Sequence, residues 1–163
     1  WPMPTTRVAF PRAVEAYDAQ GKKLFSSVSI WVLMDDRTRS MVLPAKSGIT
    51  VPGILLGTEI EMPQSLHPGE HTNAVEYEAQ ETDLDINGHV NNTRYLDWVA
   101  NLPIDEVRQA KELTVCYLSE VLPHQKLQLE WTAEEGALTV DGCRRRTDVT
   151  FAAERIFAVK VVF

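Results

Sequence analysis

One short helical pattern followed by a run of alternating stretches constrains the fold more than any other feature of the sequence. Four apolar residues recur at the spacing of one helix face: Tyr95, Trp98, Val99 and Leu102. Asn91 or Asn92 is a natural N-cap for this helix, and Pro103 is expected to end it. The sequence therefore predicts one helix early in the second half of the chain.

Apolar and polar residues alternate in the stretches after this helix, as in half-buried strands. Four such stretches follow the helix and a further strand precedes it: residues 113–117, 127–131, 149–153, 157–163 and 73–79. A turn over 134–136 is expected to join a hairpin, and Asp141-Gly142 is expected to break another segment. One helix with a run of antiparallel strands predicts an α+β fold in which a curved sheet wraps the helix.

The first part of the chain contains strand patterns without a helix. A hairpin is predicted from a strand over 14–17, a turn at Gly21 and a long strand over 27–34. Residues 44–69 contain closely spaced prolines and glycines, which is typical of a connector. The first part also resembles the back half of the second, a weak sign of a repeat. The predicted domains are a strand-only unit, a linker and a complete α+β unit: residues 1–46, 47–70 and 71–163.

Charge and composition exclude several classes of function. The net charge is -7, so the chain has no general attraction for nucleic acid, and an acidic partner needs a local basic patch. The longest apolar stretches fall far short of the roughly 20 residues of a membrane span. Cys116 and Cys143 lack metal-ligand spacing, and we expect two buried free thiols in a reducing compartment.

A polar loop just before the helix contains the residue types needed for chemistry. Asp85, Asn87 and His89 occupy alternate positions, so an extended backbone would place them on one side. Unpaired backbone N–H groups of Val90, Asn91 and Asn92 at the helix start could stabilise a developing oxyanion. A nearby carboxylate could then activate water or attack an acyl group, with neither metal nor cofactor. The alternative is that the loop only supplies turn and capping contacts.

This loop and the helix start resemble the active-site segment of the acyl-acyl carrier protein (ACP) thioesterases, bacterial and plant-type. The resemblance rests on Asp83-Leu84-Asp85-Ile86-Asn87-Gly88-His89-Val90-Asn91-Asn92 and continues through Trp98. Residues 29–35 are similar to the long strand of the family's first domain, and Tyr117-Leu118-Ser119-Glu120-Val121 to the strand after the helix. The family is built of two tandem hotdog domains. The resemblance implies one complete hotdog preceded by a partial one, and a chain that begins past the first helix of the family.

The resemblance also implies an activity and a set of catalytic residues. The family hydrolyses fatty acyl-ACP to free fatty acid and ACP in fatty acid biosynthesis, without a metal or cofactor. The family's catalytic positions fall on Asp85, Asn87, His89 and Glu120. Asn87 would hold the reacting carboxylate or the thioester carbonyl, His89 would position or activate water, and Asp85 or Glu120 would be the base or nucleophile. Val121 replaces the cysteine that follows the glutamate in plant-type members.

Several further expectations concern partners and location. Arg144-Arg145-Arg146 is either a solvated turn or strand end, or a docking patch for the acidic carrier protein. Two other functions stay open: an acyl-CoA thioesterase of the wider hotdog class, and a truncated, non-catalytic acyl-binding module. We expect the bacterial cytoplasm rather than the plastid stroma, with a homodimer as one possible assembly. Trp31, Trp98 and Trp131 are expected to pack in the core or between domains, and His67, His71 and His124 to be solvated.

Overall fold

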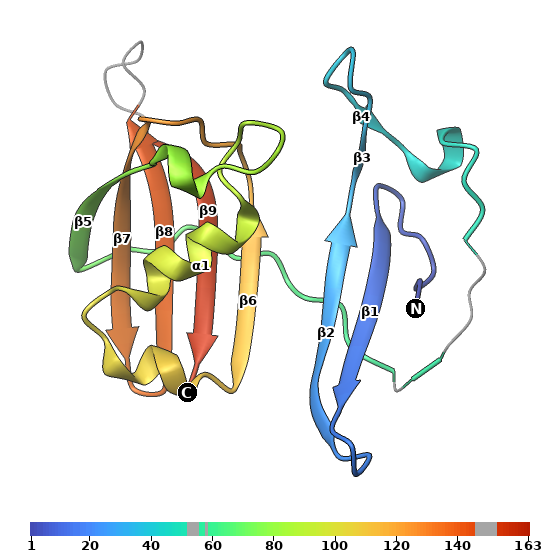
Figure 1. Cartoon of the computed structure of the whole chain (residues 1–163), viewed down its shortest axis with the longest axis horizontal. Helices are drawn as coiled ribbons and strands as arrows, with labels where there is room; N and C mark the ends of the chain where they lie inside the picture. The colour runs from blue at the N-terminus through green and yellow to red at the C-terminus, as the bar shows by residue number, and fades with distance from the viewer. Residues whose placement is uncertain (52–55, 58, 146–152) are drawn as a thin grey trace. The chain divides into compact units, whose positions relative to one another are not determined.

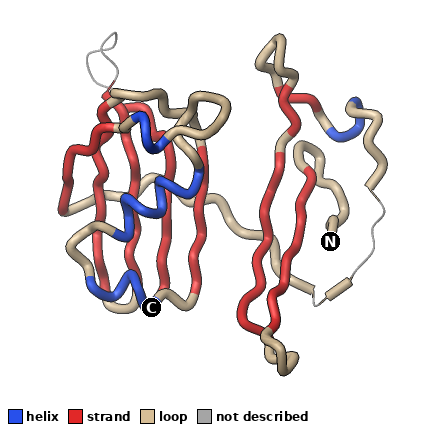
Figure 2. Tube along the Cα trace, viewed as in Figure 1, coloured by secondary structure: helices blue, strands red, loops and turns tan. Residues whose placement is uncertain are grey.

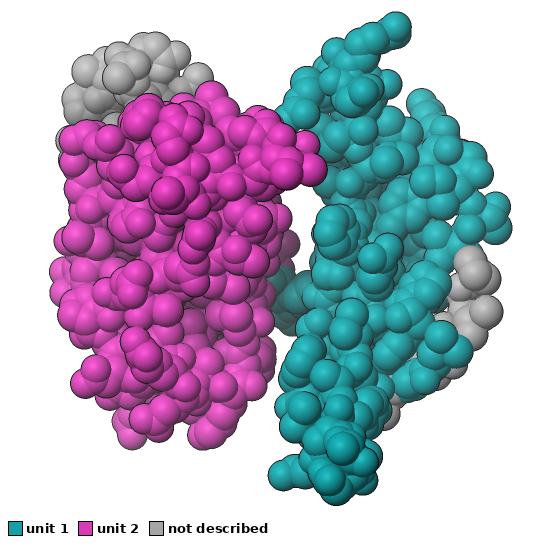
Figure 3. Space-filling view, viewed as in Figure 1, with its two compact units in different colours: residues 1–64 teal, residues 65–163 magenta. Residues whose placement is uncertain are grey.

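The chain divides into two units, residues 1–64 and 65–163, coloured separately in Figure 3. A computed structural model describes residues 1–51, 56–57, 59–145 and 153–163. The division falls inside the stretch predicted as a linker, and the predicted domain bounds stay a prediction. Each unit is described separately below.

The first unit is built on a hairpin of β1 (Phe10–Tyr17) and β2 (Lys23–Trp31). Asp18 shapes its turn, because Oδ1 accepts the N–H groups of Gln20 and Lys22, while Gly21 has a φ of 80°. The predicted long strand is interrupted after Trp31, and β3 (Leu33–Met34) pairs with β4 (Met41–Val42) instead. A 3₁₀ helix, η1 (Pro44–Lys46), follows.

Trp31 is 57% exposed, so it does not pack in a core, and its packing between domains stays a prediction. Its indole N–H donates to Ser29 Oγ at 2.8 Å, and the Arg12 guanidinium lies 5.8 Å from the ring centroid. The physical reason for this exposure is that, in the part of the first unit that the structure describes, the sheet lacks a covering layer. Among the described residues up to Gln64, no α-helix covers the two-stranded sheet, so its large side chains stay exposed.

The described residues of the second unit form one α-helix across a five-stranded antiparallel sheet (Figures 1 and 2). The sheet order is β5-β7-β8-β9-β6. Its elements are β5 (Asn73–Glu78), η2 (Glu81–Asp83), α1 (Asn92–Ala100), η3 (Asp105–Gln109), β6 (Glu112–Tyr117), β7 (Lys126–Glu134), β8 (Ala137–Arg145) and β9 (Ala153–Val162). The α+β prediction is confirmed. The described helices are all too short or too polar to cross a membrane.

The core of the second unit lies between α1 and the sheet. Trp98 is 2% exposed and packs against Tyr77 with ring centroids 4.4 Å apart and the planes tilted by 36°. Tyr95 meets Phe157 edge-on at 4.8 Å. Buried aliphatic side chains of the sheet complete the layer: Leu127, Leu129, Leu138, Val140, Val159 and Val161. Asn91 is the N-cap, and its Oδ1 accepts the Thr93 N–H at 3.0 Å. The expected burial of Trp98 and Trp131 is confirmed.

Two strand predictions in this unit need correction. Asp141-Gly142 does not break a segment, because β8 runs through it with only a shift in pairing between Gly142 and Cys143. The ring of Phe157 occupies the space that a Cβ at Gly142 would need, so the glycine allows close packing rather than a turn. The predicted strand over 149–153 lies outside the described residues except for Ala153, where β9 begins and continues through the last predicted strand.

Candidate functional site

A pocket of about 330 Å³ opens where α1 begins, next to the segment that follows β6. All four residues predicted to be catalytic line it: Asp85, Asn87, His89 and Glu120. Three come from the loop before α1, and the fourth comes from the other side of the pocket, three residues after β6 ends. The fold therefore brings together residues that are up to 35 positions apart in the sequence.

The loop from Leu84 to Val90 is a tight turn, so the expected extended backbone is wrong. Leu84 and Val90 form an isolated antiparallel bridge. Within it, the Asp85 N–H donates to the His89 carbonyl at 2.8 Å, and the Gly88 N–H donates to the Asp85 carbonyl at 3.1 Å. Gly88 has a φ of 77°, which glycine adopts without strain. The turn brings the three polar residues to one pocket by folding back.

Asn87 holds both oxygens of the Asp85 carboxylate. The backbone N–H of Asn87 donates to Oδ1 at 2.8 Å, and its side-chain amide donates to Oδ2 at 3.3 Å. The backbone hydrogen bond is the main reason that the pKa of Asp85 lies below its usual range. The carboxylate is therefore ionised at neutral pH, and its oxygens accept hydrogen bonds rather than donate them.

His89 and Glu120 face each other across the pocket. Nε2 of His89 lies 3.4 Å from Oε2 of Glu120, and their side chains are 28% and 53% exposed. Hydrogen bonds anchor the segment that carries Glu120. The Val90 N–H donates to the Val121 carbonyl at 2.9 Å, and Val121 itself is fully buried. The arrangement can orient the imidazole toward a ligand in the pocket.

The helix start offers fewer free N–H groups than predicted. The Val90 N–H is bound to Val121 as described, and the Asn91 N–H donates to the Asp83 carbonyl at 2.8 Å. The expectation of unpaired groups is wrong for these two residues, because the loop and the segment after β6 use them for anchoring. In the described part of the chain, only the Asn92 N–H among the three predicted groups has no hydrogen-bond acceptor.

The sequence pattern places Tyr95 on the apolar face of the helix and Tyr117 in a strand, and it predicts no role in the pocket for either tyrosine. Both line the pocket, together with Leu118 and Ser119. The Tyr117 hydroxyl donates to the Asn92 carbonyl at 3.0 Å and so joins the end of β6 to the first turn of α1. Burial raises the pKa of Tyr95 to about 12, so its hydroxyl keeps its proton at neutral pH. The signal in the sequence is the position of Tyr117, a hydroxyl-bearing residue three positions before Glu120.

The arginine run is only partly described. Arg144 forms hydrogen bonds with groups of its own domain: Gln125, Glu154 and the backbone of Glu120. Arg145 is the last residue of β8, and Arg146 lies outside the described residues. Next to the run, Cys143 is half-buried, and burial raises the pKa of its thiol to about 11.

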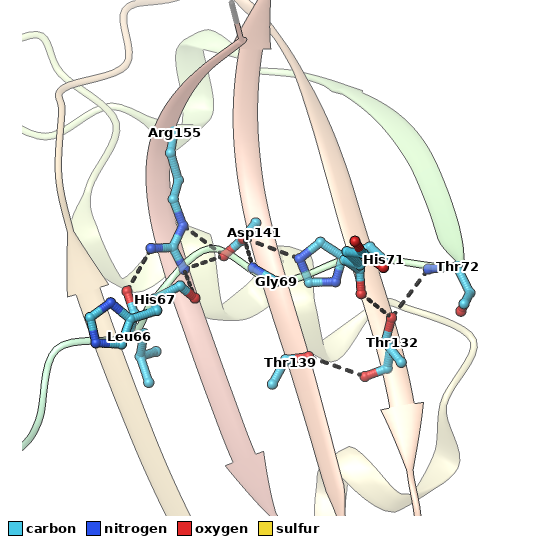
Figure 4. A network of polar contacts seen from close by, with 10 residues as sticks. Leu66, His67, Gly69, His71, Thr72, Thr132, Thr139, Asp141 and Arg155 are labelled. Carbon is cyan, nitrogen blue, oxygen red and sulfur yellow. Dashed lines mark hydrogen bonds and ion pairs between the residues drawn. The ribbon is translucent and has the colours of Figure 1, made fainter.

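A second polar cluster lies outside the pocket lining, around Asp141 on β8 (Figure 4). Arg155 Nε donates to Asp141 Oδ1 at 2.8 Å, and His71 Nε2 lies 3.1 Å from Oδ2. Arg155 also donates to the carbonyls of Leu66 and His67 at 2.6 and 3.1 Å. The His71 side chain is only 5% exposed, so the prediction that it is solvated is wrong. Within the described residues, no group of three or more His, Cys, Asp or Glu side chains is arranged to hold a metal ion.

Comparisons with known proteins place the second unit in a family. The model of the acyl-ACP thioesterase C-terminal domain matches residues 66–155, more than half of the chain. No curated protein sequence matches. An acyl-ACP thioesterase structure from Bacteroides thetaiotaomicron is similar with a TM-score of 0.78 and 23% identity over 99% of this chain and 65% of that one. The 12:0-ACP thioesterase from Umbellularia californica is similar with a TM-score of 0.66 and 21% identity over 99% and 63%.

These likenesses confirm the predicted hotdog fold, in which a curved antiparallel sheet wraps one helix. The chain spans less than two thirds of the length of either structure. At identities below 25%, the similarity concerns the fold and not the substrate.

Proposed function

Because the chain belongs to the acyl-ACP thioesterase family, we propose that it hydrolyses the thioester of fatty acyl-ACP to free fatty acid and ACP. The observation that carries this proposal is the pocket at the start of α1, where two carboxylates, an amide and an imidazole converge: Asp85, Glu120, Asn87 and His89. Such a set can hydrolyse an activated acyl group without a cofactor. The proposed place of the reaction is fatty acid biosynthesis in the bacterial cytoplasm.

In the first route, water attacks the thioester carbonyl. His89 takes the proton of the attacking water, and Glu120 at 3.4 Å stabilises the imidazolium that forms. The new C–O bond gives a tetrahedral oxyanion. When that intermediate collapses, the C–S bond breaks, and His89 returns the proton to the departing thiolate. Glu120 keeps the imidazole oriented through both steps.

In the second route, Asp85 attacks the carbonyl directly. Its Oδ2 would form a mixed anhydride while the C–S bond breaks, and water activated by His89 would then hydrolyse the anhydride. The two hydrogen bonds from Asn87 orient the carboxylate for this role. They also withdraw charge from it, which weakens it as a nucleophile. The lowered pKa of Asp85 therefore favours the first route.

In either route, the oxyanion needs a hydrogen-bond donor. The Asn92 N–H at the start of α1 can supply one, and the helix dipole favours negative charge at that end. The Tyr117 hydroxyl donates to the Asn92 carbonyl, which fixes the backbone of this residue, while Asn92 also lines the pocket.

The proposed partner is the acidic carrier protein. An arginine run in an acidic chain can steer such a partner, and within Arg144-Arg145-Arg146 the docking proposal rests on the charge of Arg145 and Arg146, because Arg144 is bonded within its own domain. The self-association of two copies into a homodimer stays a prediction that light scattering can test.

The test is free-thiol release from palmitoyl-ACP and octanoyl-ACP, with the chain as it exists and its His89→Ala variant. Loss of a positioned proton-transfer group is expected to lower turnover by roughly a hundredfold or more. His67→Ala is the matched control, because that side chain is exposed and outside the pocket. Equal turnover in the wild type and His89→Ala contradicts the assignment of the site.

Two other outcomes identify the alternatives. Faster hydrolysis of octanoyl-CoA than of octanoyl-ACP indicates an acyl-CoA thioesterase of the wider hotdog class. Binding of acyl-ACP without any turnover by the wild type indicates a non-catalytic acyl-binding module. An added full-length relative serves as the positive control for the substrates.

A further inference from the structure

We propose that Arg144 is a positioning residue, which holds the segment carrying Glu120 so that its carboxylate faces His89. This inference rests on the proposed function of the pocket and goes beyond it, because Arg144 is not part of the pocket lining. It also gives Arg144 a role other than carrier docking.

The first observation is the number of backbone and side-chain groups that the guanidinium joins. Nη1 donates to Gln125 Oε1 at 2.5 Å and to the Glu120 carbonyl at 3.5 Å. Nη2 donates to Glu154 Oε2 at 2.8 Å, across the β8–β9 pair in which the two residues face each other. One planar group thus ties two adjacent strands to the segment after β6.

The second observation is how Gln125 extends this contact along the segment. Its Oε1 also accepts the Leu122 N–H at 3.1 Å. The Arg144 guanidinium and the Leu122 amide therefore share one acceptor, and Glu120 lies two residues before that amide. A shift of Arg144 would remove one contact at each end of the 120–125 segment.

The third observation is that the other side of the same segment is already fixed. Leu118 and Ser119 donate their N–H groups to the Ile156 carbonyl, and Val121 accepts from Val90. These bonds set where the segment leaves β6 and where it meets the loop of His89. Hydrogen bonds with Ala79 hold its other end, at His124 and Gln125. Arg144 adds a constraint between them, from β8.

Charge and burial argue against docking by this arginine. The side chain is 24% exposed, and the Glu154 carboxylate compensates its charge at 2.8 Å. A docking cation needs to present uncompensated charge to solvent, where it can attract an acidic surface. Arg144 instead directs its donors toward its own domain.

Arg144→Lys separates the two roles, because lysine keeps the charge but has no planar fork. We expect kcat to fall about tenfold on both octanoyl-ACP and octanoyl-pantetheine, with KM changed less than about twofold. Arg108→Gln, which removes an exposed charge outside the pocket, is the matched control. A rise in KM for octanoyl-ACP alone, or unchanged kcat and KM for both substrates, overturns the proposal.

A double-mutant cycle distinguishes positioning from general loss of structure. If Arg144 acts through Glu120, the effect of Arg144→Lys on kcat shrinks to less than about twofold when Glu120→Gln is already present. An equal fold-change in both backgrounds overturns the proposal, since it means that Arg144 does not act through that carboxylate.

Amide hydrogen exchange tests the same inference without turnover, so it also gives a result if the wild-type chain hydrolyses neither substrate. We expect exchange of the Leu122 and Gln125 amides to quicken about tenfold in Arg144→Lys, with α1 amides changed less than about twofold. Unchanged exchange at both amides overturns the proposal, as does a uniform rise across the domain. Failure of the proposed function is separate: it appears as absent turnover in the wild type.

Discussion

Two pairs of histidine and carboxylate in the same domain have similar geometry and opposite surroundings. His89 and Glu120 are 3.4 Å apart with side chains 28% and 53% exposed, whereas His71 and Asp141 are 3.1 Å apart with side chains 5% and 8% exposed. The first pair lines a pocket, and the second is covered by the segment at residues 66–71 (Figure 4). The distance between the two groups therefore does not decide what such a pair does; access to a ligand does.

The neighbours of each pair lead to the same conclusion. Arg155 bonds to Asp141 through two nitrogens and to two backbone carbonyls, so the buried carboxylate is compensated by a cation. Tyr95, Tyr117 and Ser119 surround the pocket pair without supplying a formal charge. We expect substitutions at the buried pair to change stability, and substitutions at the pocket to change turnover.

The largest expected effect is on the buried side. Asp141→Ala leaves the Arg155 guanidinium, which is 17% exposed, without its carboxylate. Breaking such a pair is expected to lower the free energy of unfolding by about 3–5 kcal/mol. Urea denaturation followed by circular dichroism measures this. Turnover per folded molecule should stay within about twofold of wild type at low temperature, and a large loss of turnover would break the comparison.

Asp85→Asn is the corresponding change at the pocket. The amide oxygen can still accept the Asn87 N–H, so the turn is kept, but the negative charge is lost. We expect kcat to fall roughly a hundredfold if Asp85 attacks the thioester, as in the second route, and less than about tenfold in the first route, where His89 and Glu120 carry the proton transfer. The urea midpoint should match that of wild type. Asp97→Asn, on the exposed face of α1, is the control, and equal turnover in both variants would remove Asp85 from the chemistry.

Replacement of His71 with alanine sharpens the comparison by removing the partner that carries no permanent charge. Asp141 keeps its hydrogen bonds from Arg155, so the loss should be smaller than for Asp141→Ala, about 1–3 kcal/mol. The same denaturation experiment measures it. A loss equal to that of Asp141→Ala would mean that the histidine, and not the arginine, is the principal partner.

Cys143 is expected to have the smallest effect. It lies two residues after Asp141, and burial followed by the carboxylates of Glu130 and Asp141 raises its pKa to about 11. Alkylation by iodoacetamide at about pH 8 should therefore be roughly a hundredfold slower in the native protein than in urea. Mass spectrometry of the Cys143 peptide measures the rate, and Cys143→Ser should leave hydrolysis unchanged. Rapid native labelling would contradict a closed environment around the buried pair.

Much of the second unit's fold was predictable because its signals are local. The spacing of Tyr95, Trp98 and Val99, with Asn91 before them, is confirmed as a capped helix over the core. The predicted break at Asp141-Gly142 is wrong for a non-local reason: the glycine makes room for the ring of Phe157 on the neighbouring strand. A glycine can therefore be required by close packing in a strand, and in that case it does not indicate a turn.

The pocket and the buried cluster differ in how much the sequence revealed. Alternation grouped Asp85, Asn87 and His89 correctly but assumed an extended backbone, whereas Glu120 entered only through the family resemblance. The buried cluster gave no local signal at all. Gly69 and Asp141 are 72 residues apart, and Arg155 lies 89 residues from Leu66. No short-range pattern in the sequence connects such partners.

The way in which the cluster holds residues 66–69 has a consequence for how this region can evolve. Arg155 binds the main-chain carbonyls of Leu66 and His67, and Asp141 accepts the main-chain N–H of Gly69 at 3.4 Å. Because every residue offers a carbonyl and every residue except proline an N–H, these three contacts do not depend on which side chains the segment carries. Side-chain substitutions in residues 66–69 can therefore accumulate with these contacts kept, provided that Arg155 and Asp141 are retained.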